Sequence, residues 1–363
     1  MKTYKVIGIM SGTSLDGLDI AYCEFSKKGS KWTYAIKAAA TLGYSAERKT
    51  KFSDLMHASG EALMREDAAF GKFIGEQVKK FIKSKKIKPA FVSSHGHTIF
   101  HQPGIGFTFQ IGSGAAIHAA CALPVVSDFR SVDVSLKGQG APLVPIGDQL
   151  LFGEYDFCLN LGGISNISFK NKTRRIAFDI SPVNMVMNAL AAVKGLEYDK
   201  DGKLAASGVI HPELLSSLNS LDFYKKKFPK SLGKEWIDLH VFPLVNALDI
   251  SVEDKLATVC EHIAIQIQLV VEKALKNAAR KKPSLFITGG GAFNKFLISR
   301  IKDALIGKAE VIVPDKNTVM FKEALIFAFL GVLRIRNEHN ALSSVTGASR
   351  DNIGGALYGK IPS

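Results

Sequence analysis

The sequence predicts an α/β protein of two lobes, and three observations predict this class. The chain has 363 residues, which is more than a single compact core usually organises. Apolar runs of strand character alternate with segments whose apolar residues recur at helical spacing. A strand, a glycine turn and a return strand follow one another twice, near residues 4–25 and 155–169. We therefore expect one such hairpin in each lobe.

The first glycine turn lies between predicted strands at residues 4–10 and 18–25. Its glycines let the backbone approach a phosphate closely, and its hydroxyls add neutral donors for an anion. No Gly-Lys-Ser/Thr motif opening a helix and no G-x-G-x-x-G motif is present, which disfavours both common nucleotide motifs. An ordinary polar hairpin turn is the alternative. The candidate phosphate-binding residues are Ser11, Gly12, Thr13, Ser14, Asp16, Gly17 and Asp19.

The rest of the first half continues the α/β alternation. Apolar spacing predicts a helix over residues 62–83, followed by a strand at 89–94. A short helix at 115–122 then leads to a strand at 124–127. The glycine-rich stretch 137–142 is a candidate hinge or lobe boundary.

The second hairpin predicts another anion-binding turn. A strand at 155–161 leads into a small polar turn at 162–166, and a return strand follows from residue 167. Strand character resumes at 175–179 and ends on Asp179. The candidate phosphate-binding residues of this turn are Gly162, Gly163, Ser165 and Asn166.

A third glycine turn occurs at a predicted helix start. Ser251 caps a long amphipathic helix, with Asp254 three residues on, and Pro283 marks its end. A strand at 284–288 then runs into a glycine turn and another helix. Backbone N–H groups at such a helix start favour anions, and bare backbone gives a flat adenosine a surface to lie against. The candidate residues are Gly289, Gly290, Gly291 and Asn294.

Composition disfavours several classes of protein. The formal net charge is +14, but the lysines lack aromatic interleaving or a nucleic-acid module, so we predict a solvated basic surface and no nucleic-acid partner. The four cysteines are far apart and include no C-x-x-C pair, which favours a reducing cytoplasm. The longest apolar stretch, 324–333, is shorter than the ~20 residues of a membrane span, so we expect no membrane segment.

The three turns, in this order, resemble the phosphate and adenosine segments of the actin, hexokinase and Hsp70 superfamily. Within it, the chain resembles the anhydro-N-acetylmuramic acid kinases much more closely, through motifs that span nearly its whole length. These motifs are residues 10–17 (MSGTSLDG), 94–96 (SHG), 110–112 (QIG), 128–130 (DFR), 138–145 (GQGAPLVP), 159–166 (LNLGGISN), 229–231 (PKS), 288–292 (TGGGA) and 345–348 (VTGA).

This resemblance implies a two-lobe actin-like ATPase fold of the ribonuclease H-like type with an interlobe cleft. The first lobe would comprise residues 1–130, joined by 346–363, and the second residues 131–345. The implied protein is a cytoplasmic homodimer that recycles cell wall with ATP and Mg²⁺. It converts 1,6-anhydro-N-acetylmuramic acid, ATP and water into N-acetylmuramic acid 6-phosphate and ADP, and all the turn residues above become ATP-binding candidates.

The resemblance assigns the general base to Asp179. The alternative is that this aspartate simply ends a strand and pairs with a basic neighbour. The sequence departs from the family pattern Asp-Thr-Gly-Pro-x-Asn, because Ile180 and Ser181 follow the aspartate. It departs again at His97, where the family usually has glutamine. The first departure affects local sugar or phosphate contacts, and the second affects a sugar contact or a supporting one.

The remaining candidates each have a structural alternative. Asp16 would hold Mg²⁺ through water or cap its own turn. Arg130 has the planar fork that suits the lactyl carboxylate of the substrate, although a structural salt bridge would also use it. Glu323, at the expected start of an apolar helix, would reach the sugar or simply favour a helix N-terminus. His95 and His97 would bond the substrate or pack, and together with His101 they lack the ligands that complete a metal site.

Two other functions remain open. A plain sugar kinase would phosphorylate a free hydroxyl without opening an anhydro ring. An Hsp70-like nucleotide switch would use ATP to change partners, but the chain shows no appended peptide-binding domain. Sugar-dependent ATP consumption distinguishes an enzyme from a switch, and a requirement for the anhydro bond distinguishes the two enzymes.

Overall fold

A computed structural model describes residues 2–12, 15–275 and 283–360. The chain divides into two compact units, one of residues 1–152 and 321–363 and the other of residues 153–320. The sequence expectation placed the boundaries instead after residues 130 and 345. The difference has a local cause, because the loop around Gly140 is tied to the first unit. Gly140 N–H donates to the buried Asp133 carboxylate at 2.8 Å, and Gln139 N–H donates to Thr346 O at 2.8 Å.

The first unit is built on a sheet of seven strands among the described residues, in the order β12-β6-β4-β1-β2-β3, with β5 paired to β4. Strands β3, β2 and β1 are antiparallel neighbours, whereas β1, β4 and β6 run parallel. The bounds are β1 Thr3–Ser11, β2 Gly17–Lys28, β3 Lys31–Gly43, α1 Ala46–Asp54, α2 Gly60–Lys85, β4 Phe91–Gln102, β5 Phe107–Ile111, α3 Gly114–Cys121, β6 Val125–Ser127, α4 Ser131–Ser135, α5 Val144–Leu150, α13 Lys316–Ile335, α14 Ser343–Thr346 and β12 Ala356–Tyr358.

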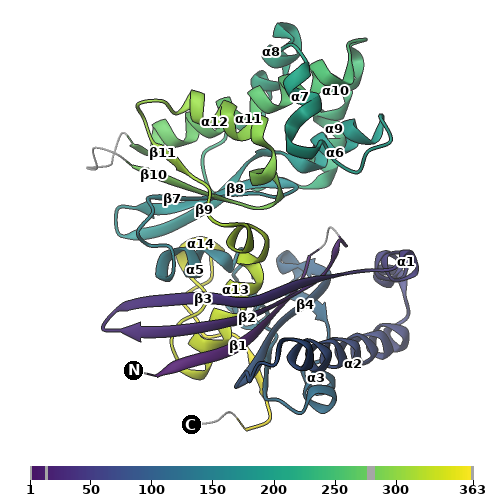
Figure 1. The fold of residues 1–363 in the computed structure, drawn as a ribbon, viewed down its shortest axis with the longest axis vertical. Helices are drawn as coiled ribbons and strands as arrows, with labels where there is room; N and C mark the ends of the chain where they lie inside the picture. The colour runs from purple at the N-terminus through teal and green to yellow at the C-terminus, as the bar shows by residue number, and fades with distance from the viewer. Residues whose placement is uncertain (1, 13–14, 276–282, 361–363) are drawn as a thin grey trace. The chain divides into compact units, whose positions relative to one another are not determined.

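Helices cover the sheet of the first unit. Helices α2 and α3 lie together along one face (Figure 1), where Phe70 and Ile117 belong to the same buried core as Ile7 of β1. Helix α13 also packs on this sheet, since the Ser93 hydroxyl of β4 donates to Phe327 O at 2.5 Å. The predicted helices at 62–83 and 115–122 and the predicted hairpin are confirmed, with β4 extending further than expected.

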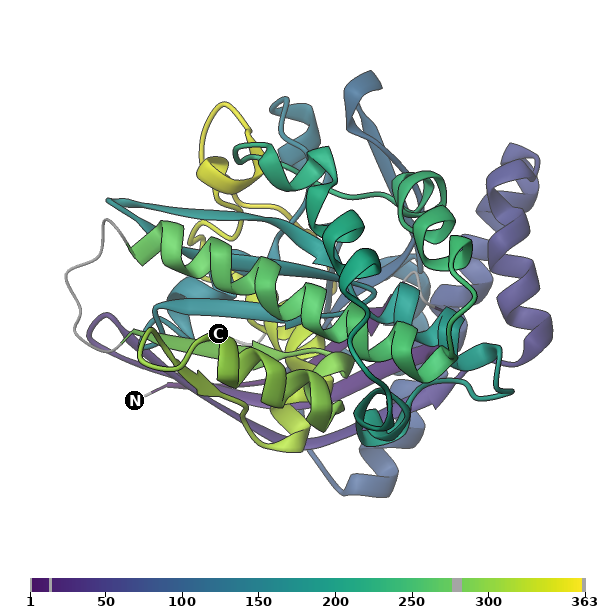
Figure 2. The ribbon, with the colours of Figure 1, turned by 90° about the horizontal axis from the view of Figure 1, so that it is seen from above.

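The second unit repeats the strand order of the first. Its sheet of five strands, in the described residues, has the order β11-β10-β7-β8-β9, with an antiparallel β7-β8-β9 meander and parallel β7, β10 and β11. The long α11 and the shorter α12 lie side by side on it (Figures 1 and 2). The bounds are β7 Phe157–Leu161, β8 Ile164–Asn171, β9 Arg174–Pro182, α6 Asn184–Ala192, α7 Lys203–Ser207, α8 Pro212–Ser220, α9 Lys234–His240, α10 Phe242–Ala247, α11 Val252–Leu275, β10 Ser284–Thr288, α12 Lys295–Ala304 and β11 Glu310–Ile312.

Short 3₁₀ turns complete both units, at residues 55–57, 103–105, 200–202, 222–225 and 290–293. The predicted cap of α11 is confirmed, because the Ser251 hydroxyl accepts a hydrogen bond from Asp254 N–H at 3.0 Å. The predicted end of this helix before Pro283 lies outside the described residues. One expectation was wrong: the second hairpin turn is shorter than residues 162–166, since β8 begins at Ile164.

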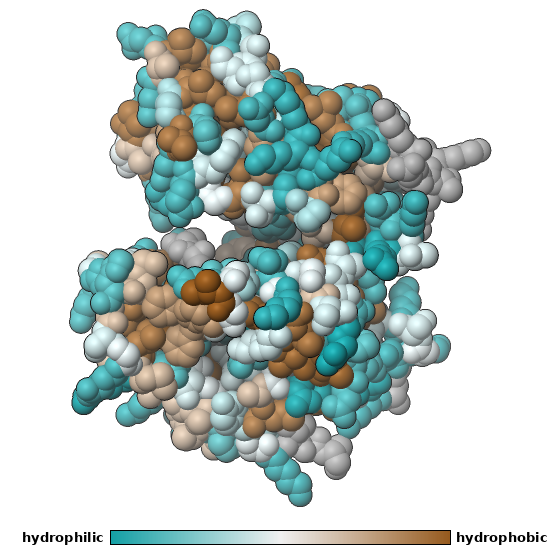
Figure 3. All heavy atoms as spheres, turned by 180° about the vertical axis from the view of Figure 1, so that it is seen from behind, coloured by the Kyte–Doolittle hydropathy of each residue, from teal (hydrophilic) through white to brown (hydrophobic). Residues whose placement is uncertain are grey.

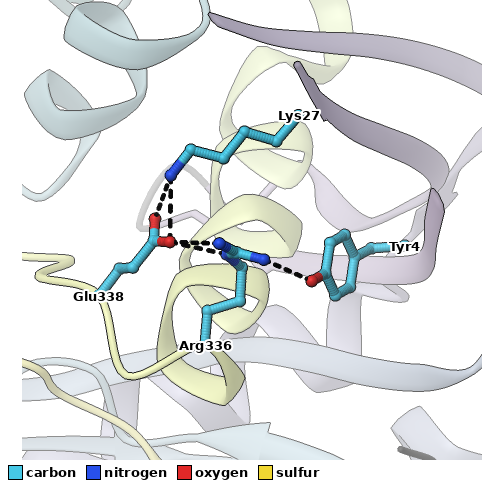
Figure 4. Close-up of polar contacts among 4 residues, drawn as sticks. All are labelled: Tyr4, Lys27, Arg336 and Glu338. Atoms are coloured by element: carbon cyan, nitrogen blue, oxygen red, sulfur yellow. Dashed lines mark hydrogen bonds and ion pairs between the residues drawn. The ribbon is translucent and has the colours of Figure 1, made fainter. Parts of the chain in front are cut away.

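Helix α13 is bent at Phe321, whose backbone angles are not helical, and the residues that directly follow the helix are tied to the strands (Figure 4). Lys27 Nζ lies 3.0 Å from Glu338 Oε2, and Arg336 Nε donates to Glu338 Oε1 at 2.8 Å. Arg336 Nη1 donates to the Tyr4 hydroxyl at 2.6 Å. Because the network includes residues of β1, β2 and the segment directly after α13, it fixes the helix on the sheet.

The surface is mixed in character. On the face drawn in Figure 3, apolar residues form small patches among hydrophilic ones, as is usual for folded domains. Within the described ranges, none of the helices combines the length and apolar character that crossing a membrane requires.

Candidate active site

The first glycine turn joins β1 to β2, but Thr13 and Ser14 lie outside the described residues. Gly12 O accepts a hydrogen bond from Leu15 N–H at 3.2 Å. Gly17 begins β2 against the end of β3, where an added Cβ would lie 2.5 Å from Leu42 O. Only glycine permits this approach. The predicted turn is therefore held tightly where it meets β3.

Ser11 is engaged inside the first unit. Its buried hydroxyl accepts a hydrogen bond from the Tyr44 hydroxyl at 2.7 Å and lies 2.9 Å from His97 Nδ1. The Ser11 hydroxyl therefore joins Tyr44 and His97 in one buried hydrogen-bonded group. Phe52 stacks on the imidazole at 4.7 Å. Ser11 thus holds His97 in one orientation, a role that the sequence did not predict.

Burial lowers the pKa of His97 to about 4. The ordinary pKa of histidine is 6.5, so between pH 6.5 and 4 the imidazole of His97 is protonated in the unfolded chain and remains neutral in the folded protein. We therefore predict that His97 makes the free energy of unfolding fall as the pH drops through this window, by up to about 1.4 kcal/mol per pH unit. Urea denaturation at pH 7, 6 and 5 should show a shallower loss for His97→Gln, and an unchanged slope would contradict this.

Asp19 is the perturbed carboxylate of the first turn. It is half-buried, and Thr41 Oγ1 donates to its Oδ1 at 2.5 Å. Burial, together with the charges of Glu323 and Asp16, raises the pKa of Asp19 to about 6. Asp16, which the sequence offered either as a magnesium residue or as a cap of its own turn, is exposed at the surface. The three carboxylates therefore create a local negative potential that a cation would relieve.

His95 and Arg130 form a second pair in this unit. Arg130 Nε donates to His95 Nε2 at 2.9 Å, and Arg130 Nη1 donates to Gly140 O at 2.6 Å. His95 Nδ1 lies 3.0 Å from Gly96 O and donates to it. Burial and the Arg130 charge hold the pKa of His95 well below its usual range. His95 is thus a neutral acceptor that orients the guanidinium.

Glu323 faces this pair from α13. The first part of α13 begins at Lys316, and its backbone is not helical at Phe321, so Glu323 lies in the first turn of the second part, as expected. Burial raises the pKa of the Glu323 carboxyl, and the positive charge of Arg130 opposes the rise. Glu323 and Arg130 are consequently coupled charges within one unit.

In the second unit the two glycine turns adjoin each other. Gly289 has φ of +86°, and an added Cβ would lie 2.6 Å from Asn160 Oδ1 and 2.8 Å from Leu161 O. Gly162 O and Gly163 O accept hydrogen bonds from Asn184 N–H at 3.2 Å and Val183 N–H at 2.8 Å. The end of β7 therefore lies among glycines whose missing side chains leave backbone groups open to a polyphosphate or a flat base.

Gly290, Gly291 and Asn294 belong to the second of these turns. Gly290 and Gly291 open the 3₁₀ turn at 290–293, and Gly291 is buried beside Leu161. Asn294 Oδ1 accepts from Leu297 N–H at 2.9 Å and so caps α12. The expected position at a helix start is confirmed, although the 3₁₀ turn separates the glycines from α12 itself.

Both polar candidates of the second turn, Ser165 and Asn166, lie inside β8 instead. Ser165 is fully buried, and its hydroxyl lies 3.0 Å from the Ser181 hydroxyl and accepts from Ser181 N–H at 3.1 Å. Asn166 pairs with Asp179 in the ladder. The departure at Ser181 therefore adds a buried hydroxyl pair, and the departure at Ile180 adds a core side chain that is 1% exposed.

Asp179 lies at a β-bulge. The pairs Asn166–Asp179 and Ser165–Ser181 leave Ile180 as the extra residue of β9, and such bulges re-aim the neighbouring side chain. Asp179 Oδ2 accepts a hydrogen bond from Leu232 N–H at 2.8 Å. Burial raises the pKa of Asp179, while this hydrogen bond and the charge of Lys230 oppose the rise. The carboxylate is half-buried, oriented and basic.

The sequence did not predict Leu232, Thr41 or Tyr44 as partners of the site. Leu232 acts through its backbone, which no side-chain pattern reveals. Thr41 and Tyr44 come from β3 and the residue after it, and only the strand register brings them to Asp19 and Ser11. The motif at Pro229, Lys230 and Ser231 was the available signal that this segment belongs to the site.

Two units with one strand order, each with a glycine turn after its first strand, define a two-unit α/β protein of the actin-like ATPase type. The chain belongs to the anhydro-N-acetylmuramic acid kinase family, and the model of that family matches residues 4–360. It is 32% identical to the anhydro-N-acetylmuramic acid kinase of Sulfurovum sp. (strain NBC37-1), over 99% of this chain and 100% of that protein. It is 35% identical to the anhydro-N-acetylmuramic acid kinase of Pseudomonas fluorescens (strain Pf0-1), over 97% of this chain and 98% of that protein.

Solved structures are similar at lower identity. Component A of the (R)-2-hydroxyglutaryl-CoA dehydratase of Acidaminococcus fermentans matches with a TM-score of 0.46 and 12% identity, covering 90% of this chain and 96% of that one. A ROK family glucokinase from Streptomyces griseus, in complex with glucose and AMPPNP, matches with a TM-score of 0.40 and 12% identity, covering 90% and 98%.

Proposed function

We propose that this protein phosphorylates 1,6-anhydro-N-acetylmuramic acid at O6 with ATP while water opens the anhydro bridge, giving N-acetylmuramic acid 6-phosphate and ADP. Membership of the family over the full chain supports the substrate and the reaction. The observation that carries the chemistry is Asp179, a half-buried carboxylate aimed by a bulge and basic for its type. No observation favours a sugar kinase without ring opening.

Asp179 acts on water in the proposed reaction. Its carboxylate takes a proton from a water molecule, whose oxygen forms a bond to the anomeric carbon as the bond from that carbon to O6 breaks. The released O6 forms a bond to the γ-phosphorus, the bond from this phosphorus to ADP breaks, and ADP leaves with its electron pair. The raised pKa of Asp179 suits this role, because a stronger base removes the proton more readily.

Arg130 binds the lactyl carboxylate in this proposal. Its Nε and Nη1 are used by His95 and Gly140, so Nη2 is the remaining donor nitrogen. The neutral His95 aligns the guanidinium without adding a competing positive charge. His97 and Glu323 are proposed to bond the sugar.

The nucleotide contacts are proposed for all three turns. Gly12, Thr13, Ser14, Gly17, Gly162 and Gly163 cradle the phosphates with main-chain N–H groups and hydroxyls, and residues 289–291 face the adenosine. Ser11, Ser165, Asn166 and Asn294 support these turns through the internal bonds described above. Asp16 and Asp19 fit a Mg²⁺ ion that keeps much of its water, because their oxygens lie in a region of negative potential. When bound, Mg²⁺ neutralises charge on the phosphates.

An assay of ADP release tests the proposed function. We expect ADP only when 1,6-anhydro-N-acetylmuramic acid is added, and little ADP with N-acetylmuramic acid, N-acetylglucosamine or glucose. Equal rates with the free sugars would favour the plain sugar kinase, and ADP release independent of sugar would favour a nucleotide switch.

We further propose a homodimer in the cytoplasm, where ATP is available. Sedimentation equilibrium should give twice the mass of one chain.

A further inference from the structure

Residues 230–232 hold Asp179 from two sides. The backbone N–H of Asp179 donates to Lys230 O at 3.1 Å, and its carboxylate Oδ2 accepts from Leu232 N–H at 2.8 Å. One bond fixes the backbone beside the bulge, and the other fixes the direction of the carboxylate. This segment therefore orients the proposed base more directly than the β8 ladder does.

The Lys230 side chain is fixed near the base. Its Nζ donates to Phe223 O at 3.3 Å and lies 4.3 Å from the centre of the Phe223 ring. The Phe228 ring stacks on Phe178 at 5.5 Å, and Phe178 directly precedes the base. The partners of the Lys230 ammonium are a carbonyl and aromatic rings, so its charge acts on Asp179 without a direct ion pair.

The loop that carries Lys230 is anchored to the helices. The Tyr224 hydroxyl lies 2.8 Å from His262 Nε2, and His262 Nδ1 lies 2.7 Å from Asn219 Oδ1. Because the Asn219 oxygen accepts, Nδ1 carries the proton and Nε2 accepts from Tyr224. Gln266 Nε2 donates to the same oxygen at 2.8 Å. Burial lowers the pKa of His262 to about 3, so this arrangement keeps one protonation pattern around neutral pH.

We propose that Lys230 is a positioning residue for Asp179, acting through its ammonium charge and through its backbone carbonyl. The inference rests on the proposed function, which makes Asp179 the base. Lys230 is the charged side chain that acts on Asp179 and opposes the rise in its pKa. Burial lowers the pKa of Lys230, and so do the positive charges of Lys273 on α11 and Lys226 in the same loop. The negative charge of Asp179 opposes this fall. The charge of Lys230 thus favours the ionised form of the carboxylate, against the effect of burial.

The test compares Lys230→Met, Lys230→Arg and the matched control Lys227→Met, an exposed lysine of the same loop. The pH dependence of kcat/KM is measured for each protein. In Lys230→Met the acidic limb should move to higher pH by roughly 1 unit. The KM for ATP should change less than about two-fold, since the side chain bears on the base and not on the nucleotide. In Lys230→Arg and in Lys227→Met the acidic limb should lie at the same pH as in the wild-type protein.

A direct titration separates this inference from the proposed function. Carboxyl ¹³C NMR of the resting protein, with Asp179→Asn for assignment, reports the titration of Asp179 without turnover. A higher midpoint in Lys230→Met supports the positioning role even if wild-type protein fails to open the anhydro sugar, which would overturn only the proposed function. An unchanged midpoint and an unmoved acidic limb, in a variant that unfolds at the wild-type temperature, would overturn the inference.

Discussion

Asp179→Asn should lower turnover by about 10²- to 10⁴-fold, which is the usual contribution of a general base. The amide oxygen still accepts the hydrogen bond that Leu232 N–H donates to the carboxylate, so the bulge should keep its shape. The amide has no basic lone pair with which to take a proton from water. ATP affinity should change less than about two-fold, because Asp179 is not part of a glycine turn. Steady-state ADP release and equilibrium nucleotide binding measure the two effects.

The matched control for this substitution is Asp222→Asn, which makes the same change at an exposed aspartate of the same unit. It should leave turnover and nucleotide binding unchanged. Turnover near the wild-type level in Asp179→Asn would remove Asp179 from the chemistry. A loss of nucleotide binding in parallel with turnover would instead assign it to the nucleotide site.

Lys322→Met should lower the free energy of unfolding by about 3–5 kcal/mol, which is typical when one partner of a buried ion pair is removed. Lys322 Nζ lies 2.7 Å from Asp148 Oδ1, and the two side chains are 6% and 4% exposed. The substitution leaves the Asp148 carboxylate buried beside an apolar side chain. Urea denaturation, with the slope of the transition held in common, measures the loss.

The double substitution of Lys322→Met with Asp148→Leu provides the control, because it removes both charges. It should regain much of the lost stability, since replacing a buried pair by apolar residues is often neutral or better. Lys225→Met, whose partner Asp222 is exposed, should not move the denaturation midpoint. A loss in Lys322→Met below about 1 kcal/mol would mean that water reaches Asp148.

Local pattern predicted the elements on which the site is built. Apolar runs and glycines predicted both hairpins, and helical spacing predicted α2 and α3 close to their observed bounds and α11 close to its observed start. The same pattern predicted the glycine turn before α12. These features depend on near neighbours in the chain, and backbone preference and apolar spacing report on near neighbours directly.

The roles of individual side chains depended on distant partners. Ser165 has the residue type of a phosphate ligand, yet the strand register buries its hydroxyl against Ser181. The orienting bond of Asp179 comes from Leu232 through the backbone, and Asp133 ties residues 138–140 to the first unit through contacts with Thr346. A single sequence does not encode such pairs as a spacing or a composition. The fold was therefore more predictable than the site.

Mass spectrometry of the product formed in heavy-oxygen water tests the central claim most directly. The protein is incubated briefly with ATP, Mg²⁺ and 1,6-anhydro-N-acetylmuramic acid, and a parallel sample of N-acetylmuramic acid 6-phosphate corrects for exchange of the anomeric oxygen with solvent. We predict N-acetylmuramic acid 6-phosphate with one heavy oxygen, at the anomeric carbon, and none in the phosphate ester. A phosphorylated sugar without the label, or phosphorylation of an ordinary sugar alone, would contradict coupled ring opening and phosphoryl transfer.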